Sequence, residues 1–418
     1  MNRLFIAMLF VFAVLISCQT DELKTEDVPE EPGYISGEEI EPLYLTAAEK
    51  FISLKTNVFA FDLLRTVYRD EEEEKNILLS PLSASLALAM LNNGAAGQTQ
   101  QEIQRTLGYD DITREEMNGY FQKLITAAQE ADPYVTFRSA NSIWTRNDFP
   151  VLEAFKEVNK SYYGAEIRSV DFGDPETRDL INAWCAEKTN DKIKEILKEV
   201  KPGAVMYLLN ALYFKSAWTW PFDKEETRNE RFYNFDGTSP LLPTMQMQKN
   251  LSYGTNESYD LLELPYGKGL FSMILLLPKG EVTLSSVIGG LDAETWEQNL
   301  SGLFPADVEV KLPRFKVEYE RQMTDDLKTL GMPSAFGSEA DFSLIHPGIC
   351  VSDVKQKTFV EVNEEGTEAA AVTIIDMEMT ALPDPEAYRF HVNRPFLYFI
   401  KEKSSGVIFF VGAMKNLQ

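Results

Sequence analysis

The chain has 418 residues, of which 44% are hydrophobic and 25% charged, values that are ordinary for a globular protein. Its 40 basic and 65 acidic residues give a formal net charge of −25, and a surface of that charge repels phosphate groups, so we expect no nucleic-acid partner. The two histidines, His346 and His391, form no recognised metal-site spacing with the cysteines or with each other, and we therefore expect no metal site and no cofactor.

The first 17 residues have the pattern of an export signal. Arg3 supplies a positive start, and residues 4–16 form an apolar run that is too short to span a bilayer. The run ends in Leu15-Ile16-Ser17-Cys18, which resembles the lipobox of bacterial lipoproteins, whose cysteine is lipidated and becomes the first residue of the mature chain. We therefore expect a signal peptide at 1–17 and a membrane anchor through a lipid on Cys18. An ordinary secretory signal with an incidental cysteine is the alternative.

Residues 18–45 are predicted to be an acidic tether. They carry Pro29 and Pro32 and show no periodicity, which is typical of a solvated segment. The expected location is outside the cytoplasm, as a cell-envelope lipoprotein of the outer membrane or cell surface, or extracellular. An acidic tether favours display on the surface.

Residues 46–418 are predicted to form one α+β domain, because helical and strand patterns occur without regular alternation. An apolar stripe at helical steps comprises Phe51, Leu54, Val58, Phe61, Leu64 and Tyr68. A second helix begins at Ser80, a good N-cap followed by Pro81, and ends at Gly94; it is apolar nearly all round and should be buried. Further predictions are a buried strand at 271–277, a helix at 319–330, and a hairpin of 396–401 and 407–413.

The stretch at 364–390 lies where a loop is expected but has the pattern of a strand. It joins the predicted strands 357–362 and 396–401, yet no Gly or Pro occurs between residues 367 and 382. One parity holds Thr367, Ala369, Ala371, Thr373, Ile375, Met377 and Met379, and the other holds Glu368, Asp376 and Glu378. A half-buried strand alternates in this way, so we expect a strand that is not yet inserted into a sheet.

Six groups of residues occur in order along the domain. They are Asn76 with Ser80-Pro81 and Ser83; Ile181-Asn182 with Trp184; Asn210-Ala211 to Trp218; Leu264-Pro265-Tyr266 with Leu312-Pro313-Arg314-Phe315; Glu361 to Ala370; and Asn393-Arg394-Pro395-Phe396. Together they resemble the motifs of the serpins, a family of serine protease inhibitors. The resemblance covers about 370 residues and implies a serpin fold with three β-sheets, about eight or nine helices and an exposed reactive-centre loop.

The resemblance also implies a mechanism. In serpins a protease cleaves the loop, the loop inserts as a strand into the central sheet, and the acyl-protease is trapped. The implied hinge comprises Gly366, Thr367, Glu368, Ala369, Ala370, Ala371 and Val372. Spacing from this hinge places the cleaved bond at Thr380–Ala381, with Met379 and Met377 as alternatives. No Arg or Lys lies between Lys357 and Arg389, which disfavours trypsin-like enzymes. The expected partners are elastase-like or chymotrypsin-like serine proteases, with cysteine proteases as a second class.

Seven other residues receive structural roles from the resemblance. Ser80, Ser83, Asn210 and Gln356 match a polar cluster where the sheet opens, although the family usually has a histidine at the position of Gln356. Trp218, Glu364 and Arg314 match the top of the sheet. Glu364 and Arg314 are expected either to pair or to be separately solvated.

Two other functions fit the sequence less well. The chain is not expected to be an enzyme, because it has no Gly-x-Ser-x-Gly motif and no recognisable catalytic base. A non-inhibitory serpin acting as a surface binding module is the alternative; such members carry bulky, charged or proline residues in the hinge, where this chain has only Glu368. We expect a monomer, with Cys185 and Cys350 as buried free thiols.

Overall fold

The computed structural model describes residues 42–130, 132–201, 203–367 and 387–418. Its helices are α1 (Ala47–Asp70), α2 (Pro81–Asn92), α3 (Gly97–Thr106), α4 (Arg114–Glu130), α5 (Glu153–Tyr163), α6 (Glu176–Lys188), α7 (Leu284–Gly290), α8 (Ala293–Ser301) and α9 (Thr324–Leu330), with short 3₁₀ turns at Lys224–Glu226 and Pro333–Phe336. The first eight strands are β1 (Ile77–Leu79), β2 (Val135–Arg146), β3 (Glu166–Val170), β4 (Met206–Ala217), β5 (Arg228–Arg231), β6 (Leu241–Thr255), β7 (Tyr259–Tyr266) and β8 (Phe271–Pro278). The others are β9 (Phe304–Pro313), β10 (Phe315–Gln322), β11 (Lys355–Asn363), β12 (Gly366–Thr367), β13 (Tyr388–His391), β14 (Phe396–Glu402) and β15 (Ile408–Met414).

The described strands form two hydrogen-bonded networks. The central sheet has six strands in the order β10-β11-β12-β4-β2-β3, and the larger network has nine strands. The three sheets implied by the resemblance become two networks because β6 is shared. It pairs with β7 over residues 252–255 and with β9 over residues 244–253, so one long strand joins two sheets. The α+β class is confirmed.

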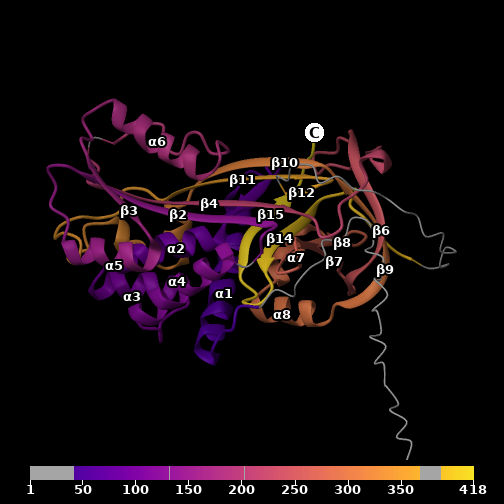
Figure 1. Ribbon diagram of the computed structural model, residues 1–418, viewed down its shortest axis with the longest axis horizontal. Helices are drawn as coiled ribbons and strands as arrows, with labels where there is room; N and C mark the ends of the chain where they lie inside the picture. The colour runs from indigo at the N-terminus through magenta and orange to yellow at the C-terminus, as the bar shows by residue number, and fades with distance from the viewer. Residues whose placement is uncertain (1–41, 131, 202, 368–386) are drawn as a thin grey trace, which may run out of the picture.

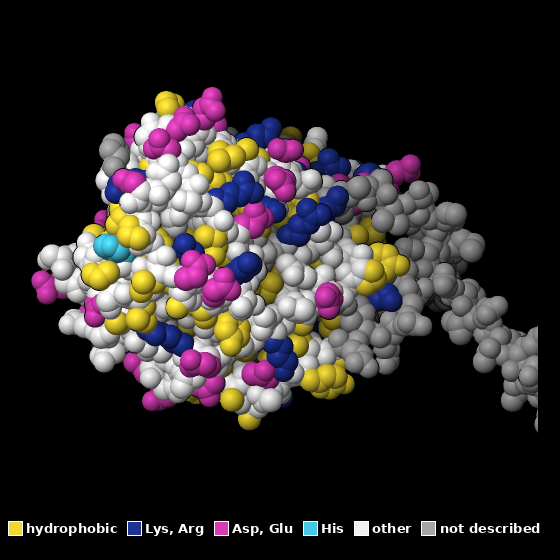
Figure 2. Space-filling model, turned by 60° about the vertical axis from the view of Figure 1, so that its left-hand side comes forward, with side chains coloured by type: hydrophobic (Ala, Val, Ile, Leu, Met, Phe, Trp, Pro, Cys, Tyr) yellow, Lys and Arg dark blue, Asp and Glu magenta, His cyan; other side chains and the backbone are white. Residues whose placement is uncertain are grey.

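Helices cover both faces of the central sheet (Figure 1). α1 to α5 lie on one side, and α6 lies alone on the other. Below α6, Trp144 of β2 and Trp184 of α6 meet edge-on in a small apolar cluster. The far end of the molecule, opposite α5, is formed by β6 and β9. On the face drawn in Figure 2, acidic and basic side chains are interspersed, so the net negative charge makes no single-signed patch there.

α2 is buried between the helical layer and the sheets, as predicted. Ser80 caps it by accepting a hydrogen bond from the backbone N–H of Ser83 at 3.2 Å, and Pro81 occupies the first turn. The strand at 271–277 and the C-terminal hairpin are also confirmed, as β8 and as the antiparallel pair β14–β15.

Two sequence predictions need correction. In α1, Phe51 and Leu54 of the predicted apolar stripe are exposed, because the buried face also carries the hydroxyls of Ser53 and Thr56, which bond to buried tyrosines. The helix predicted at 319–330 begins only at Thr324. Its first part belongs to β10, which pairs with β11 along its whole length.

Candidate functional site

The first two residues of the predicted hinge form a strand in the central sheet. Gly366 and Thr367 make up β12, which pairs with Asn363 and Val362 of β11 on one side. On the other side the same two residues pair with Ala217 and Ser216 of β4. The chain therefore turns back after β11 and starts a new strand between two existing ones.

Position 366 requires a glycine because β12 lies very close to the backbone of β4. Its φ is +146°, a conformation that side chains rarely adopt, and a Cβ would lie 2.0 Å from the carbonyl oxygen of Ser216. That contact is with backbone of β4, which cannot move aside as a flexible side chain would. A glycine at this position therefore permits β12 to pair.

Thr367 faces the interior. Its side chain is buried, and its hydroxyl lies 2.5 Å from the Tyr266 hydroxyl, within hydrogen-bond distance. Tyr266 is itself buried, which raises its pKa and keeps it a neutral hydroxyl. Trp218 stacks on Tyr266 with ring centroids 4.4 Å apart and planes 9° apart. The first residue of the predicted inward parity thus enters a prepared aromatic site.

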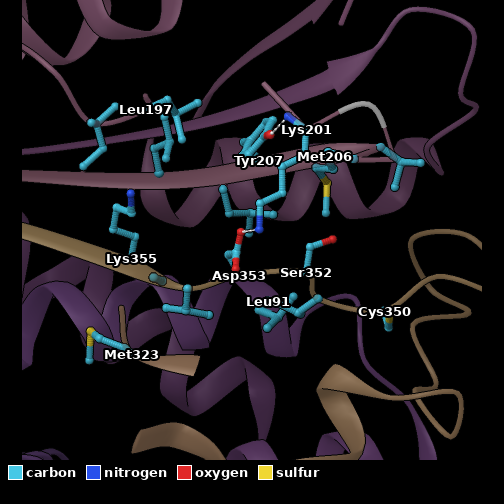
Figure 3. A pocket seen from close by; sticks show the side chains of 18 of the residues that line it. Leu91, Leu197, Lys201, Met206, Tyr207, Met323, Cys350, Ser352, Asp353 and Lys355 are labelled. Carbon is cyan, nitrogen blue, oxygen red and sulfur yellow. Dashed lines mark hydrogen bonds and ion pairs between the residues drawn. The ribbon is translucent and has the colours of Figure 1, made fainter. Parts of the chain in front are cut away.

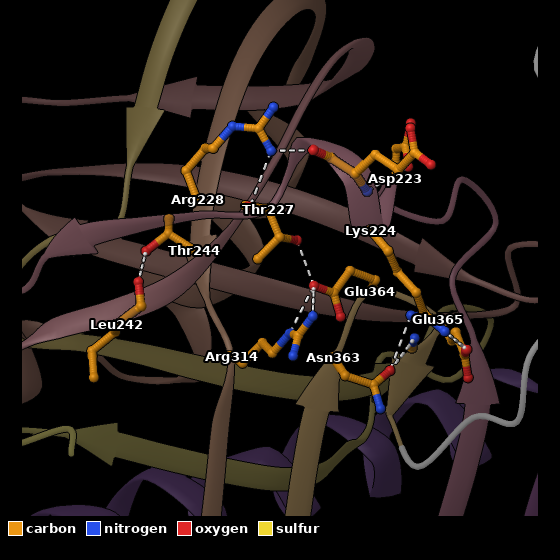
Figure 4. A network of polar contacts seen from close by, with 12 residues as sticks. Asp223, Lys224, Thr227, Arg228, Leu242, Thr244, Arg314, Asn363, Glu364 and Glu365 are labelled. Carbon is orange, nitrogen blue, oxygen red and sulfur yellow. Dashed lines mark hydrogen bonds and ion pairs between the residues drawn. The ribbon is translucent and has the colours of Figure 1, made fainter.

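The turn before β12 is held by side chains from three segments (Figure 4). Glu364 is buried, and its Oε1 accepts hydrogen bonds from Arg314 Nε at 2.7 Å and from Thr227 Oγ1 at 2.5 Å. Asn363 Oδ1 accepts from the backbone N–H groups of Glu365 and Gly366 at 3.0 and 3.3 Å. The pairing of Glu364 with Arg314, one of two expected alternatives, is the one observed.

The ionisation of Glu364 follows from these contacts. Burial alone would raise its pKa, but the hydrogen bonds from Arg314 and Thr227 outweigh burial, so the pKa lies below its ordinary value. The carboxylate is therefore charged at neutral pH and acts as a fixed acceptor. Trp218 completes the top of the sheet, because its indole N–H donates to the carbonyl of Asn363 at 2.9 Å.

The predicted polar cluster is only partly joined. Gln356 Oε1 accepts from the backbone N–H of Ser80 at 2.9 Å, and its Nε2 donates to the Ser80 carbonyl at 2.8 Å. Ser83 joins through its own N–H, which donates to Ser80 Oγ. Asn210 Nδ2 donates instead to Asn141 Oδ1 of β2 at 2.7 Å, and it is separated from Gln356 by the gap between β4 and β11. The cluster is split by the gap between β4 and β11. Where β12 ends, β4, which carries Asn210, pairs with β2 and with no other described strand.

A cavity of about 860 Å³ occupies the end of the gap between β4 and β11 that lies away from β12 (Figure 3). Its walls are the first residues of β4 (206–210), the segment 349–356 that leads into β11, and α2. Ser83, Asn210 and Gln356 all contribute to its lining. β12 and the cavity therefore lie at opposite ends of one gap between β4 and β11.

Ion pairs cross from the segment that precedes β4 to the β10–β11 side. Lys201 pairs with Asp353, as Figure 3 shows, and Lys198 Nζ lies 3.5 Å from Glu320 of β10. Neither pair was predicted, since these charges are far apart in the sequence. Thr227 and Asn363 were also missed as partners of the hinge turn, because side-chain reach across a turn leaves no periodic signal.

Several predicted residues lie outside the described part of the chain. They are Glu368, Ala369, Ala370, Ala371, Val372, Met377, Met379, Thr380, Ala381 and the predicted lipidation site Cys18. Cys185 and Cys350 are free thiols; Cys185 is buried, which raises its pKa to about 12, but Cys350 is exposed, so its predicted burial is wrong. Within residues 42–367 and 387–418, apart from 131 and 202, no group of three metal-ligating side chains gathers, and none of the helices is long and apolar enough to cross a membrane.

Three comparisons relate the chain to known proteins. The family profile described as Serpin (serine protease inhibitor) matches residues 54–417. An uncharacterized serpin-like protein of Thermococcus kodakarensis is 34% identical over 374 residues, which are 88% of this chain and 86% of that protein. The native-state crystal structure of the thermophilic serpin tengpin has a TM-score of 0.82 at 31% identity and covers 93% of this chain and 100% of its own. Human thyroxine-binding globulin, solved in complex with thyroxine, has a TM-score of 0.81 at 27% identity and covers 88% of this chain and 99% of its own.

Proposed function

The chain belongs to the serpin family, and from this premise we propose that it inhibits serine proteases as a suicide substrate. The family generally inhibits proteases rather than catalysing a reaction. One observation carries the proposal for this chain: Gly366 and Thr367 pair with both β4 and β11. A loop that has started a strand between two others can continue it.

Continued insertion is chemically favourable along the same gap. Each further loop residue would pair with backbone groups on both neighbouring strands, and alternate residues would follow the buried direction of Thr367. Those residues are small or uncharged, beginning with Ala369 and Ala371. From Thr367 to Thr380 an extended strand would reach about 46 Å, at roughly 3.3 Å per residue. The 860 Å³ cavity lies at the far end of the gap, where room for such a strand is needed.

The proposed cleavage site is Thr380–Ala381, with Met379 or Met377 as alternatives. The residues next to the bond, 379–382, are small or apolar, and the nearest basic residues are Lys357 and Arg389. An elastase-like or chymotrypsin-like enzyme would accept these side chains, whereas a trypsin-like pocket requires a cation.

The location belongs to the same proposal. A lipid on Cys18 would tether a monomeric inhibitor outside the cytoplasm through residues 18–45. Radiolabelled fatty acid should enter the wild-type protein and not the Cys18→Ser variant. Labelling that survives the substitution would contradict the anchor and leave the inhibitor unaffected.

The rival function is a non-inhibitory binding protein. It is favoured by the similarity to thyroxine-binding globulin, a serpin-fold protein solved with thyroxine bound. The hinge argues against it, because Gly366 to Val372 contains no proline and no bulky residue that would block insertion.

A protease panel tests the proposal. Elastase-like, chymotrypsin-like and trypsin-like enzymes are incubated with the protein, and SDS-resistant complexes are sought on gels. We expect a complex with one of the first two, release of a C-terminal peptide that begins at Ala381, and a sharp rise in the thermal midpoint after cleavage. Cleavage without any complex and with an unchanged midpoint would contradict inhibition and favour the binding role.

A further inference from the structure

The cavity of about 860 Å³ between β4 and β11 has the properties of a site for a small molecule. Ligand sites in proteins have volumes of about 300–1,000 Å³ and are lined mostly by apolar side chains, with a few polar groups at fixed places. Apolar lining comes here from α2, from the chain that leads into β4 and from the residue before α9, and it includes Leu88, Leu91, Leu197, Met206 and Met323. The interior of the cavity is therefore suited to an apolar molecule.

The cavity is open to solvent. Every residue of α2 is buried except Ala87, which lines the cavity. Because α2 is otherwise enclosed between the helical layer and the sheets, the exposure of Ala87 comes through the gap. Cys350 also lines the cavity and is exposed. A molecule can thus enter from the surface and reach α2 without unfolding the protein.

Charged side chains surround the entrance. Of the described residues that line the cavity, five are charged: the lysines Lys198, Lys201 and Lys355 and the acids Glu199 and Asp353. The lining therefore has more positive than negative groups, in a chain whose formal net charge is −25. The side chains of Lys198 and Lys201 are 69% and 46% exposed, so their ion pairs with Glu320 and Asp353 are weak surface pairs that can exchange for another anion.

Figure 3 shows how the charged and apolar parts are arranged. Lys201 reaches across the gap to Asp353, and this pair spans the middle of the cavity. Lys355 lies on one side of the pair and Cys350 on the other, while Leu91 of α2 lies below it in this view. An anionic group bound beside Lys201 would leave an attached apolar chain free to lie over α2.

We propose that this cavity binds an amphipathic anion with a single apolar chain, such as a long-chain fatty acid, in the uncleaved protein. The lysines at the entrance bind the carboxylate, and the apolar lining binds the chain. Burial of apolar surface contributes roughly 25 cal/mol per Å², so the chain supplies most of the affinity, and the charged group sets the orientation. No pairing with the backbone of β4 or β11 is required.

A bound chain would also slow insertion of the loop, and this consequence rests on the proposed function. A strand that continues β12 along the gap reaches the same volume, so the chain and the strand exclude each other. At a ligand concentration of 100 times Kd, about one molecule in 100 has an empty cavity. Insertion that requires an empty cavity would then be about 100-fold slower.

Binding of palmitate to the uncleaved full-length protein tests the site, with hexadecanol as the uncharged analogue of equal chain length. The Cys18→Ser background ensures that no covalent lipid competes. Alkylation of Cys350 by iodoacetamide, followed by peptide mass spectrometry, reports the location, because Cys350 lines the cavity whereas Cys185 is buried. Ala87→Leu fills the cavity from α2, and Ala127→Leu, a half-buried alanine of α4 outside the cavity, is the matched control.

We expect palmitate to protect Cys350 from alkylation and to bind about tenfold more weakly to Ala87→Leu, because the added side chain takes up part of the cavity. Ala127→Leu should bind as the Cys18→Ser parent does. Binding that leaves Cys350 unprotected would overturn the site. An affinity unchanged in a folded Ala87→Leu protein would overturn it as well.

Lys201→Gln with Lys355→Gln tests the charged group and leaves the apolar lining intact. Both side chains lie at the entrance, so this variant remains informative if Ala87→Leu fails to fold. Palmitate should bind about tenfold more weakly, because the attraction between lysine and carboxylate is lost, whereas hexadecanol should bind as before. Equal effects on the two ligands would overturn the assignment of an anion.

The binding and the proposed inhibition can fail separately. Palmitate that protects Cys350 in a protein that traps none of the proteases would refute inhibition and support the ligand site. A protein that traps a protease but binds no palmitate would refute the ligand site and leave inhibition intact. Bound palmitate that does not slow insertion after cleavage would show that the chain and the strand do not exclude each other.

Discussion

The guanidinium of Arg314 holds the carboxylate of Glu364 through Nε at 2.7 Å and Nη2 at 2.5 Å, both to the same oxygen. Arg314 joins β9 to β10, and Glu364 lies in the turn between β11 and β12. The pair therefore ties the outer edge of the central sheet to the point at which the hinge enters it. Because the carboxylate is buried and the arginine is partly exposed, the contact matters more for Glu364 than for Arg314.

Arg314→Gln should destabilise the top of the sheet. It leaves the buried carboxylate with Thr227 as its remaining side-chain donor, and an undersatisfied buried group costs about 1–3 kcal/mol. Urea unfolding would measure the loss. Arg314→Lys keeps the charge but not the planar fork, so it should recover only part of the stability. Arg228→Gln, an exposed neighbour, is the control; a loss in Arg314→Gln no larger than in that variant would contradict the role of the pair.

The same pair predicts a pH dependence. The pKa of Glu364 is lowered in the folded state from its ordinary value of 4.5, so its charged form is favoured by folding. Its contribution to stability is therefore complete above about pH 5 and is lost as the pH falls through the folded pKa. Glu364→Gln should lower the thermal midpoint most near neutral pH, and the difference from wild type should shrink below pH 4.5. A difference that stays constant across this range would show that shape rather than charge is responsible.

Gly366→Ala should remove β12 from the sheet. The added Cβ would meet the Ser216 carbonyl oxygen at 2.0 Å, and the φ of +146° is unfavourable for alanine. Amide hydrogen exchange at Thr367 should accelerate in the uncleaved protein, and fewer cleavage events should end in a trapped complex. Gly289→Ala is the matched control, since a Cβ there meets no atom within 4 Å. Unchanged exchange at Thr367 would mean that the hinge pairs without its glycine.

The sequence correctly predicted the elements that depend on interactions between residues close together in the chain. The cap and proline at Ser80 and Pro81 defined the start of α2, and the apolar run at 271–277 defined β8. Strand parity also predicted that Thr367 faces inward, and its burial confirms this for the one inward position of the loop that is described.

Prediction failed where tertiary partners decide the outcome. The stripe through Phe51 in α1 was misjudged because buried serines and threonines, paired with tyrosines far along the chain, occupy the inner face. Tyr319 continues the helical spacing of Met323 and Leu327, yet pairing with β11 makes residues 319–322 a strand. Asn210 is separated from Gln356 by the gap between β4 and β11. The residue pattern of a single strand does not indicate how far apart two neighbouring strands lie, so this separation could not be predicted.

Gln356→Ala should weaken the contact between β11 and the start of α2 at Ser80. The amide satisfies both the N–H and the C=O of Ser80, and both are buried, so its removal should cost about 1–3 kcal/mol. Gln356→His should be intermediate, because a neutral imidazole has one donor and one acceptor but a different reach. Chemical denaturation measures both variants against Gln248→Ala, an exposed glutamine. A Gln356→Ala protein as stable as that control would mean that water from the adjacent cavity replaces the amide.

The ion pairs across the opening should slow insertion by a small, salt-dependent amount. Lys201–Asp353 and Lys198–Glu320 connect the segment before β4 to the β10–β11 side, and adding a strand between β4 and β11 moves these sides apart by about 4.8 Å. At that separation both contacts would have to break. Because their side chains are substantially exposed, each contributes at most about 1 kcal/mol, which is about a fivefold change in rate.

Lys198→Gln with Lys201→Gln should therefore insert a cleaved loop several-fold faster at low salt, and at 1 M salt the double variant and wild type should converge because the wild-type pairs are already screened. Stopped-flow fluorescence of Trp218, which stacks next to the hinge, can follow the insertion after rapid cleavage. Lys328→Gln, whose surface pair with Asp325 lies within α9, is the control. A double variant that inserts at the wild-type rate at every salt concentration would show that these pairs rearrange along with the moving strands instead of holding the gap closed.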